Sequence, residues 1–425
     1  MTARSAQVWW QDRNVGTIRE DERGIIHFRY SDEWLHRDDF PVSISLPLHK
    51  ADQELEAHSF FAGLLPEGAT RQRICRQQGI NQSDDMGLLL AIGEDCAGAL
   101  SVLPPDIRPE LGSSTPVALP QEDFERLLRK KGQVQGTAVA SAQRFSLAGA
   151  QDKLPVIRRQ EQLFLPDAHH PSSHIIKFET LNRVCFAEYM AGRIAHSIGL
   201  PVVSTSYRTT VVGKSTLQWL EVERYDRVKD SKGRLVRLHQ EDILQALGMP
   251  VSMKYQSDGG PSIAQIGELL RQHLDRPAIA LSQLRDWQIC NFLIGNWDGH
   301  AKNLALLYTP GSAAPTLAPF YDLVAIEFLN QLTPGSYARD MALFVGSEKN
   351  PERITKAQWE EMARQLSMPP KPLLQRVREL AEQLPGIATA CREEFAREHG
   401  DRALYDKLVG MVRKRSRWTL KTMAG

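Results

Sequence analysis

The stretch Trp297-Asp-Gly-His-Ala-Lys-Asn303 places an acid and an amide five positions apart, in a loop that follows an apolar segment. This D-x-x-x-x-N spacing is typical of the catalytic loop of kinases, where the acid accepts the proton of the attacking hydroxyl and the amide holds a metal ion. A further acid that completes such a metal site stands 19 residues beyond Asn303, in Phe320-Tyr-Asp322. Because Asp and Asn are also common turn residues that cap helices, the pattern needs support from the rest of the chain.

The chain has 425 residues, which exceeds the roughly 250 to 300 residues at which a single core stops growing. Two or more lobes are therefore expected. A hydrophobic content of 42% and a charged content of 24% are ordinary for a soluble globular protein. The net charge of +1 indicates no class of partner. Basic side chains gather only locally, in residues 126–131 and 413–417.

The five cysteines form no Cys-x-x-Cys pair, and an odd number fits neither a disulfide framework nor a zinc knuckle. We expect them to be reduced and mostly buried. The N-terminal segment lacks the apolar core of a signal peptide, and no run approaches the roughly 18 apolar residues of a membrane span. These features predict a cytoplasmic protein without a membrane partner.

Strand-like and helix-like segments divide the chain into three parts. Short apolar pieces (8–10, 25–30 and 42–46), two helical segments (60–65 and 86–92) and a proline-rich linker (104–120) define a first unit at residues 1–105. Residues 106–226 are expected to be mostly β, with a short helix at 122–130, a periodic helix at 184–198 and strands at 154–157, 174–178, 204–212 and 217–223. Residues 227–425 are expected to be helical, at 241–247, 263–273, 282–293, 356–366, 371–384 and 403–421.

Lys177 interrupts an apolar strand, where it shares a face with Ile175. One interpretation is a lysine that grips the α and β phosphates of a nucleotide, oriented by Glu188 on the following helix. The alternatives are a lysine that protects an edge strand from aggregation and a glutamate that is merely solvated.

Two further segments fit a nucleotide site. The turn at residues 146–153 keeps its side chains small around Gly149, which lets backbone N–H groups approach a phosphate, although a tight hairpin explains it equally well. Residues 221–226 stand where a kinase chain passes between lobes, so backbone groups of Glu223, Arg224 and Tyr225 are candidates for binding an adenine edge. The order of all these features along the chain is that of a protein kinase.

On these residues the chain resembles the HipA family, the serine/threonine kinase toxins of bacterial type II toxin–antitoxin pairs. The resemblance covers nearly the whole chain, including residues 43–48 and 95–99 of the first unit. Its main segments are Phe145-Ser-Leu-Ala-Gly-Ala-Gln-Asp-Lys153, His174-Ile-Ile-Lys177, Val222-Glu-Arg-Tyr-Asp-Arg227, Lys254-Tyr-Gln-Ser-Asp-Gly-Gly-Pro261, Asp298-Gly-His-Ala-Lys-Asn303 and Pro319-Phe-Tyr-Asp322.

The resemblance implies an α+β, two-lobed protein-kinase-like fold, with a small extra N-terminal subdomain, a β-rich N-terminal lobe and an all-helical C-terminal lobe. It also implies ATP and Mg²⁺ as cofactors, with Asp298 as the catalytic base and Asn303 and Asp322 as metal ligands. Ser146 matches the family's autophosphorylated serine. The implied nucleotide contacts are Ala148, Gly149, Ala150, Gln151, Asp152, Lys153, Lys177, Glu223, Arg224, Tyr225, Gln240, His300, Ala301, Lys302, Asn303, Tyr321 and Asp322.

The family's partners are implied as well. Its members bind a small helix-turn-helix antitoxin, and the complex represses its own operator DNA. Known substrates include aminoacyl-tRNA synthetases, although this sequence does not name its substrate. The alternative from another functional class is a regulatory scaffold for a DNA-binding partner, in which catalysis is dispensable. The basic clusters are candidates for DNA phosphate contacts, or else form solvated helix faces.

Overall fold

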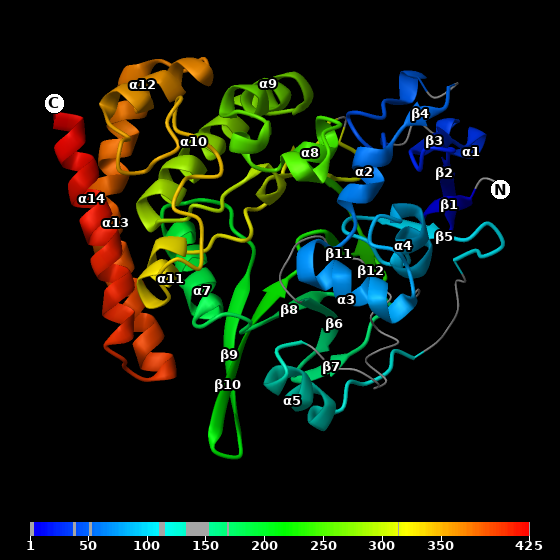
Figure 1. Cartoon of the computed structure of the whole chain (residues 1–425), viewed down its shortest axis with the longest axis horizontal. Coiled ribbons are helices and arrows are strands. Elements are labelled where there is room, and N and C mark those ends of the chain that lie inside the picture. Colours follow the sequence, from blue (N-terminus) through cyan, green and yellow to red (C-terminus); the bar gives the residue numbers. More distant parts are fainter. Residues whose placement is uncertain are drawn as a thin grey trace. The chain divides into compact units, whose positions relative to one another are not determined.

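The computed structural model describes residues 4–36, 40–50, 53–109, 115–132, 153–167, 170–312 and 314–424. Ser146, Ala148, Gly149, Ala150, Gln151 and Asp152 lie outside these residues. The chain forms two compact units. Unit 1 comprises residues 1–180, 208–251 and 306–312, and unit 2 comprises residues 181–207, 252–305 and 313–425. Figure 1 labels the helices and strands of both units.

Unit 1 begins with an antiparallel sheet of order β4-β3-β2-β1-β5. Its strands are β1 (Ser5–Trp10), β2 (Arg13–Glu20), β3 (Ile26–Tyr30), β4 (Leu55–Glu56) and β5 (Leu100–Leu103). The accompanying helices are α1 (Asp32–Leu35), α2 (His58–Gly63), α3 (Gly68–Gln78) and α4 (Asp85–Ile92). Phe28, Trp34 and Phe61 are completely buried in the core that these elements share. Of the short apolar pieces expected to form small strands and turns, the one at 42–46 contains a turn, closed by the N–H of Leu46 and the carbonyl of Ser43.

A second sheet of unit 1 has the order β7-β6-β8-β10-β9. Its strands are β6 (Lys153–Arg159), β7 (Gln162–Phe164), β8 (His174–Phe178), β9 (Thr205–Val212) and β10 (Ser215–Glu223), and the first residues of β9 belong to unit 2. Helix α5 (Gln121–Arg129) packs on this sheet through an edge-to-face contact between Phe124 and Trp219. Strand β8 therefore lies in the middle of the sheet, with a neighbour on each side.

The end of unit 1 differs from the predicted helix at 241–247. After β11 (Arg227–Lys229) and β12 (Leu235–Arg237), strand β13 (His239–Asp242) leads into the short helix α8 (Ile243–Ala246). Asp242 caps that helix through a reciprocal capping box with Gln245, so the helix cannot begin earlier. Glu241 consequently lies on a strand and is fully buried.

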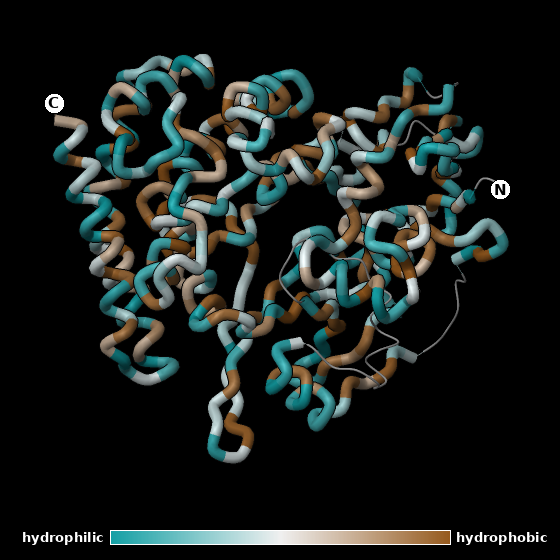
Figure 2. The backbone as a smooth tube through the Cα atoms, in the orientation of Figure 1, coloured by the Kyte–Doolittle hydropathy of each residue, from teal (hydrophilic) through white to brown (hydrophobic). Residues whose placement is uncertain are grey.

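Unit 2 is dominated by helices, and the sequence predicted all of them except α11 (Ile326–Leu332) in their main positions. They are α7 (Val184–Ser197), α9 (Ile263–His273), α10 (Pro277–Ile294), α11 (Ile326–Leu332), α12 (Lys356–Gln365), α13 (Pro370–His399) and α14 (Leu404–Ala424). The short strand β15 (Thr316–Leu317) is an addition to them, and β14 (Ala305–Tyr308) starts in this unit. Figure 2 shows hydrophobic and hydrophilic stretches alternating along α13 and α14, as expected for helices with one buried face.

Helix α13 is much longer than the predicted helix, which ended at Leu384. It continues through Pro385 to His399. A proline inside a helix removes one backbone hydrogen bond, but here the second half buries Phe395 against Phe186 of α7 and Tyr405 of α14. The packing of this aromatic cluster outweighs the local cost of the proline.

All five cysteines are free and buried, as the sequence predicted. Among the helices in the described part of the chain, none is long and apolar enough to cross a membrane.

Glu241 sits in a buried polar cluster that ties β13 to the first sheet region. Its carboxylate accepts hydrogen bonds from the Ile44 N–H at 3.0 Å and the Tyr308 hydroxyl at 2.5 Å, and it also contacts the Ser43 hydroxyl. Burial raises the pKa of Glu241 to about 7 despite these donors. Nearby, burial lowers the pKa of His239 to about 4, while its Nε2 donates to the Val42 carbonyl at 2.8 Å.

The raised pKa predicts a loss of stability as the pH rises. Between the ordinary value of 4.5 and about 7, the unfolded chain ionises this glutamate while the folded chain keeps its proton. Over that window the wild type should lose on the order of 3 kcal/mol relative to Glu241→Gln, which cannot ionise. His239 contributes with the opposite sign in both proteins and cancels in the difference. Urea unfolding at pH 5 and pH 7.5 measures this effect, and parallel changes in the two proteins would contradict it.

Candidate active site

The loop that carries Asp298 follows helix α10 and is fixed by asparagines. Gly295 ends the helix with a left-handed conformation, φ 68°. Asn296 then bonds back to Asn291 through both its backbone N–H (2.8 Å) and its side-chain Nδ2 (3.0 Å), and its Oδ1 accepts the N–H of Asp298 at 3.3 Å. A Cβ at Gly299 would lie 2.7 Å from the Nδ2 of Asn291, so a larger residue after Asp298 would displace the Asn291 side chain that anchors this loop. The loop is thus anchored before Asp298 by Asn296 and after it by the close packing of Gly299 on Asn291.

Within this loop Asp298 is exposed, whereas Trp297, His300 and Asn303 are buried. The hydroxyl of Tyr255 donates to the Oδ1 of Asp298 at 3.0 Å. An exposed carboxylate on a rigid, buried loop is accessible to a substrate hydroxyl and is held in one place. Tyr255 was not among the predicted site residues, although it lies in the quoted segment Lys254–Pro261.

Asn303 ends the short 3₁₀ turn Ala301–Asn303 and forms a capping box with His300, whose N–H donates to the Asn303 Oδ1 at 3.0 Å. The Tyr321 hydroxyl donates to the carbonyl of Lys302 at 2.7 Å. This bond joins the segment that carries Asn303 to the segment that carries Asp322. The two predicted metal ligands therefore come from neighbouring segments of unit 2.

Asp322 has a positive φ of 54°, a conformation that few residues other than glycine adopt. Such backbone strain clusters at functional sites, because the surrounding structure must hold it. Here the preceding residues are held firmly: Phe320 exchanges backbone hydrogen bonds with Pro201 (2.7 Å) and Val203 (3.0 Å), and its ring stacks on Trp287.

The donor set fits a magnesium ion that is bound together with a nucleotide. Among the described residues, no group of three or more His, Cys, Asp or Glu side chains is arranged to hold a metal ion. One carboxylate from Asp322 and one amide oxygen from Asn303 would leave most coordination positions to phosphate oxygens and water, which is how Mg²⁺ is usually held in nucleotide sites. The amide oxygen has a second lone pair beside the one that accepts the N–H of His300.

In unit 1, the structure removes one alternative for Lys177. Its strand β8 lies between β6 and β10, so Lys177 is not an edge-strand residue. It is buried, and its direct cross-strand neighbour in the register of β6 and β8 is Lys153. Two like charges directly opposite each other are destabilising in a sheet. The register thus places two basic side chains, Lys153 and Lys177, opposite each other on neighbouring strands.

The segment predicted to bind adenine is anchored by Arg224. Its guanidinium forms a two-pronged ion pair with Asp226, at 2.9 and 2.6 Å, and its backbone N–H donates to the Ser173 carbonyl at 3.0 Å. An adenine edge would therefore have to be read by groups other than this N–H. Gln240 lies near this segment, because its side-chain oxygen accepts a hydrogen bond from the Tyr225 hydroxyl. Glu188 is buried on α7 in the other unit, and its pairing with Lys177 stays a prediction.

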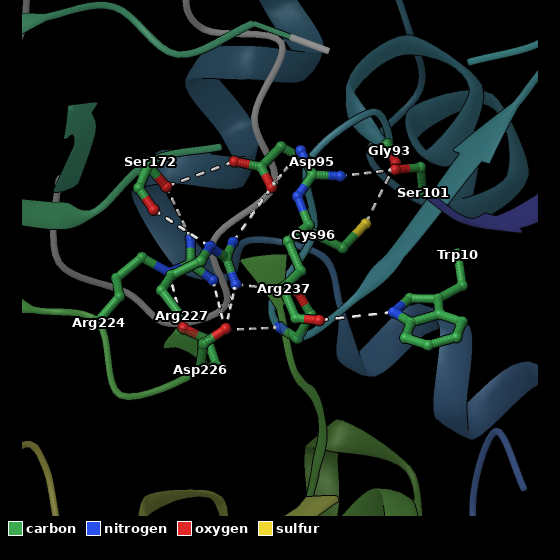
Figure 3. A network of polar contacts seen from close by, with 11 residues as sticks. Trp10, Gly93, Asp95, Cys96, Ser101, Ser172, Arg224, Asp226, Arg227 and Arg237 are labelled. Atoms are coloured by element: carbon green, nitrogen blue, oxygen red, sulfur yellow. Dashed lines mark hydrogen bonds and ion pairs between the residues drawn. The ribbon is translucent and has the colours of Figure 1, made fainter. Parts of the chain in front are cut away.

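Arg224 belongs to a buried ion cluster, shown in Figure 3. Its charged members are two carboxylates and three guanidiniums: Asp95, Asp226, Arg224, Arg227 and Arg237. Burial alone would raise the pKa of Asp226, but Arg224 and Arg227 hold it well below its usual range. Burial and the neighbouring Arg224 lower the pKa of Arg227 to about 10, so it is still protonated at neutral pH. The cluster thus carries one positive charge more than its carboxylates balance.

The cluster joins residues 95–101 to residues 224–237. Asp226 also accepts the N–H of Gly98 at 2.9 Å, and Asp95 contacts Arg227 at 3.3 Å and Arg237 at 3.1 Å. Gly98 has φ 77°, and a Cβ there would lie 2.9 Å from the backbone nitrogen of Gln240. The segment 95–99, which the sequence resemblance singled out, therefore packs directly against residues 224–240.

The basic residues of the C-terminal cluster at 413–417 do not all lie on the surface. Arg413, Lys414 and Arg417 are exposed, but Arg415 is buried. Its guanidinium donates to Glu327 at 2.7 Å and lies 4.4 Å from the centre of the Trp297 ring. Arg415 thus supports the residue that precedes Asp298, and only its exposed neighbours remain candidates for binding an anion.

The fold and this loop define a protein-kinase-like enzyme. A family model described as the HipA-like C-terminal domain matches residues 145–387, and one described as the HipA N-terminal domain matches residues 6–103. The chain belongs to the HipA family. The fold is the α+β, two-lobed, kinase-like fold that the sequence predicted, and the protein is a kinase.

Individual relatives agree with this assignment. A Sinorhizobium fredii protein named as a kinase, Y4mE, is 35% identical over 86% of both chains. The serine/threonine-protein kinase toxin HipA of Shewanella oneidensis is 26% identical over 84% of this chain and 82% of that protein. A solved complex of HipA, HipB and operator DNA from Shewanella oneidensis has a chain of the same fold, with a TM-score of 0.83, 23% identity and coverage of 99% and 98%.

The ion cluster predicts that substitutions at its different members lower the free energy of unfolding by different amounts. Asp226→Asn should lower the free energy of unfolding by about 3 to 5 kcal/mol, because it leaves buried guanidiniums without their partner. Arg237→Met should cost clearly less, because it removes the surplus charge. In addition, the Nε and Nη2 of Arg237 find no hydrogen-bond partner among the described residues, since the ion pair with Asp95 lacks hydrogen-bond geometry. Denaturant midpoints of the two variants measure the difference, and equal losses would show that the charge balance is irrelevant.

Proposed function

We propose that the chain is an ATP-dependent serine/threonine protein kinase that acts as the toxin of a type II toxin–antitoxin pair. The observation that carries this proposal is the exposed Asp298 on a buried, rigid loop, with Asn303 and Asp322 in adjoining segments of the same unit. The name of the Shewanella oneidensis relative, a serine/threonine-protein kinase toxin, supports the choice of acceptor and the biological role.

In the proposed mechanism, Asp298 accepts the proton of a seryl or threonyl hydroxyl as that oxygen attacks the γ-phosphorus of ATP; the bond from the γ-phosphorus to the β–γ bridging oxygen breaks, and ADP leaves. Asn303 and Asp322 hold Mg²⁺, which when bound neutralises the charge of the phosphates. Lys177 and Lys153 bind phosphate oxygens, and Glu223, Tyr225 and Gln240 lie along the segment proposed for adenine. His300, Lys302 and Tyr321 hold the segments that carry the metal ligands in place.

Self-inactivation by phosphorylation of Ser146 is part of the proposal. A phosphoserine adds about −1.5 to −2 charge at neutral pH. At the mouth of a phosphate loop formed by Ala148 to Lys153, that charge would compete with the phosphates of ATP. The serine hydroxyl has no role in transfer to another protein, so its replacement by alanine should preserve transfer and abolish self-inactivation.

We further propose a HipB-like helix-turn-helix antitoxin and, through it, operator DNA as partners in the cytoplasm. The solved Shewanella oneidensis complex of HipA, HipB and operator DNA supports this part. An aminoacyl-tRNA synthetase is the proposed class of substrate, on the sequence resemblance alone. The second candidate function, a scaffold for a DNA-binding partner, is compatible with the same complex but does not explain the exposed Asp298.

Asp298→Asn should abolish most phosphoryl transfer while leaving the fold intact, because the amide has the same volume and cannot take up the proton. A positioned general base contributes about 10² to 10⁴ in rate. Transfer of labelled phosphate from Mg²⁺-ATP to protein measures the effect, with the melting temperature as the control for folding. Near-normal transfer by a stable variant would refute the role of Asp298 and favour the scaffold.

Asp322→Ala should abolish most of the thermal stabilisation that Mg²⁺-ATP gives the wild type. A ligand that binds only the folded state stabilises it by about 2.7 kcal/mol at 100 times its dissociation constant. Melting curves with ATP and either Mg²⁺ or EDTA separate the metal-dependent part. If the variant gains as much stability from Mg²⁺-ATP as the wild type, Asp322 is not a metal ligand.

A further inference from the structure

We propose that Tyr255 is the positioning residue of the catalytic base, an inference that rests on the proposed function of Asp298. The proposal explains the segment Lys254-Tyr-Gln-Ser-Asp-Gly-Gly-Pro261, to which the mechanism above assigns no role. Its starting point is the hydrogen bond of 3.0 Å from the Tyr255 hydroxyl to the Oδ1 of Asp298. Both residues belong to unit 2, so the contact lies within one compact body.

The glycines of this segment shape the turn that presents Tyr255. The N–H groups of Asp258 and Gly260 both donate to the carbonyl of Tyr255, each at 3.0 Å. Gly259 has φ 89°, and a Cβ at Gly260 would lie 2.2 Å from the carbonyl oxygen of Met253. Only glycine fits these two places without moving the backbone. The turn therefore folds back on the Tyr255 carbonyl and fixes the backbone of Tyr255, from which its side chain projects.

A shared segment anchors Tyr255 and Asp298 to each other. Gln256 donates its N–H to the Ala342 carbonyl at 3.0 Å, and its Oε1 accepts the Phe344 N–H at 2.9 Å. Ala342 in turn donates its N–H to the carbonyl of Trp297 at 2.8 Å. The residues next to Tyr255 and next to Asp298 are thus bound to the same residue, Ala342. These backbone hydrogen bonds hold the segment of Tyr255 and the segment of Asp298 next to each other.

The ring of Tyr255 is also restrained from the side. It meets the imidazole ring of His300 edge to face, with centroids 5.4 Å apart, and Lys254 lies 5.3 Å from its centre. The half-buried phenol is therefore held in one direction, toward Asp298. With Oδ1 engaged by Tyr255, the carboxylate presents its other oxygen, Oδ2, to the hydroxyl of the substrate. Tyr255 selects the oxygen that receives the proton and keeps the carboxylate from rotating away.

The role predicts a loss of turnover without a loss of nucleotide binding. Tyr255→Phe removes one hydroxyl and keeps the ring against His300. Loss of a hydrogen bond to a charged group should lower kcat about tenfold, with the KM for ATP unchanged. The matched control is Tyr405→Phe, which removes a hydroxyl in the same unit from a ring that stacks on Phe186, far along the chain from the loop. This control should keep the wild-type kcat.

The experiment measures transfer of labelled phosphate from Mg²⁺-ATP, with the full chain and a pool of seryl and threonyl peptides as acceptors. Wild type, Tyr255→Phe, Asp298→Asn, the double variant and Tyr405→Phe are compared, each with a melting temperature. If Tyr255 acts through Asp298, Tyr255→Phe should have no further effect in the Asp298→Asn background. Where the residual rate of Asp298→Asn is below detection, the separate kcat and KM values of Tyr255→Phe decide.

The outcomes separate the two claims. If Asp298→Asn is inactive and Tyr255→Phe keeps the wild-type kcat, the positioning role is wrong and the proposed function stands. A raised KM for ATP at unchanged kcat, or an equal loss in both backgrounds, also overturns the positioning role. If wild type transfers no phosphate or Asp298→Asn transfers it normally, the proposed function itself fails.

Discussion

The buried ion cluster around Asp226 is the constraint on which the arrangement of unit 1 depends. Charges are expensive to bury, and they remain buried only when partners meet them in the right geometry. Here the partners come from three separate parts of the chain, at residues 95–101, 172 and 224–237. Residues 95–101 cannot move away from residues 224–237 without exposing several charges or leaving them without a partner. That explains why these two segments lie in one compact unit although more than a hundred residues separate them in the sequence.

Periodicity was a good guide where one face of an element is buried. It gave the observed ends of helix α9, whose apolar residues repeat with the period of a helix. It also gave the observed ends of strand β8, whose apolar residues form one short run. It failed where a local polar interaction decides. Asp242 starts a helix and leaves Glu241 on a strand, and no apolar pattern contains that information. It also failed at Pro385, where distant aromatic packing outweighs a local preference.

The candidate site, too, could be predicted only in part from the sequence. Spacing along the chain connected Asp298 with Asn303 and pointed to Asp322 as the further acid, and the resemblance assigned the same residues to the same roles. The sequence could not reveal Tyr255, because its contact with Asp298 depends on how residues 297, 342 and 256 pair through their backbones. Nor could the sequence show that Arg415 is buried against Trp297, since a run of basic residues does not indicate which of its side chains point into the protein. Lys177 is an intermediate case: its strand was predictable, but only the order of strands shows that the strand is central.

Arg415 has a consequence for the timing of folding. Its guanidinium rests on Trp297, yet the ribosome adds it more than a hundred residues after the loop. At typical rates of about 5 to 20 residues per second, the loop waits on the order of ten seconds for this support. The contact between Arg415 and Trp297 therefore forms only after most of α14 has been synthesised.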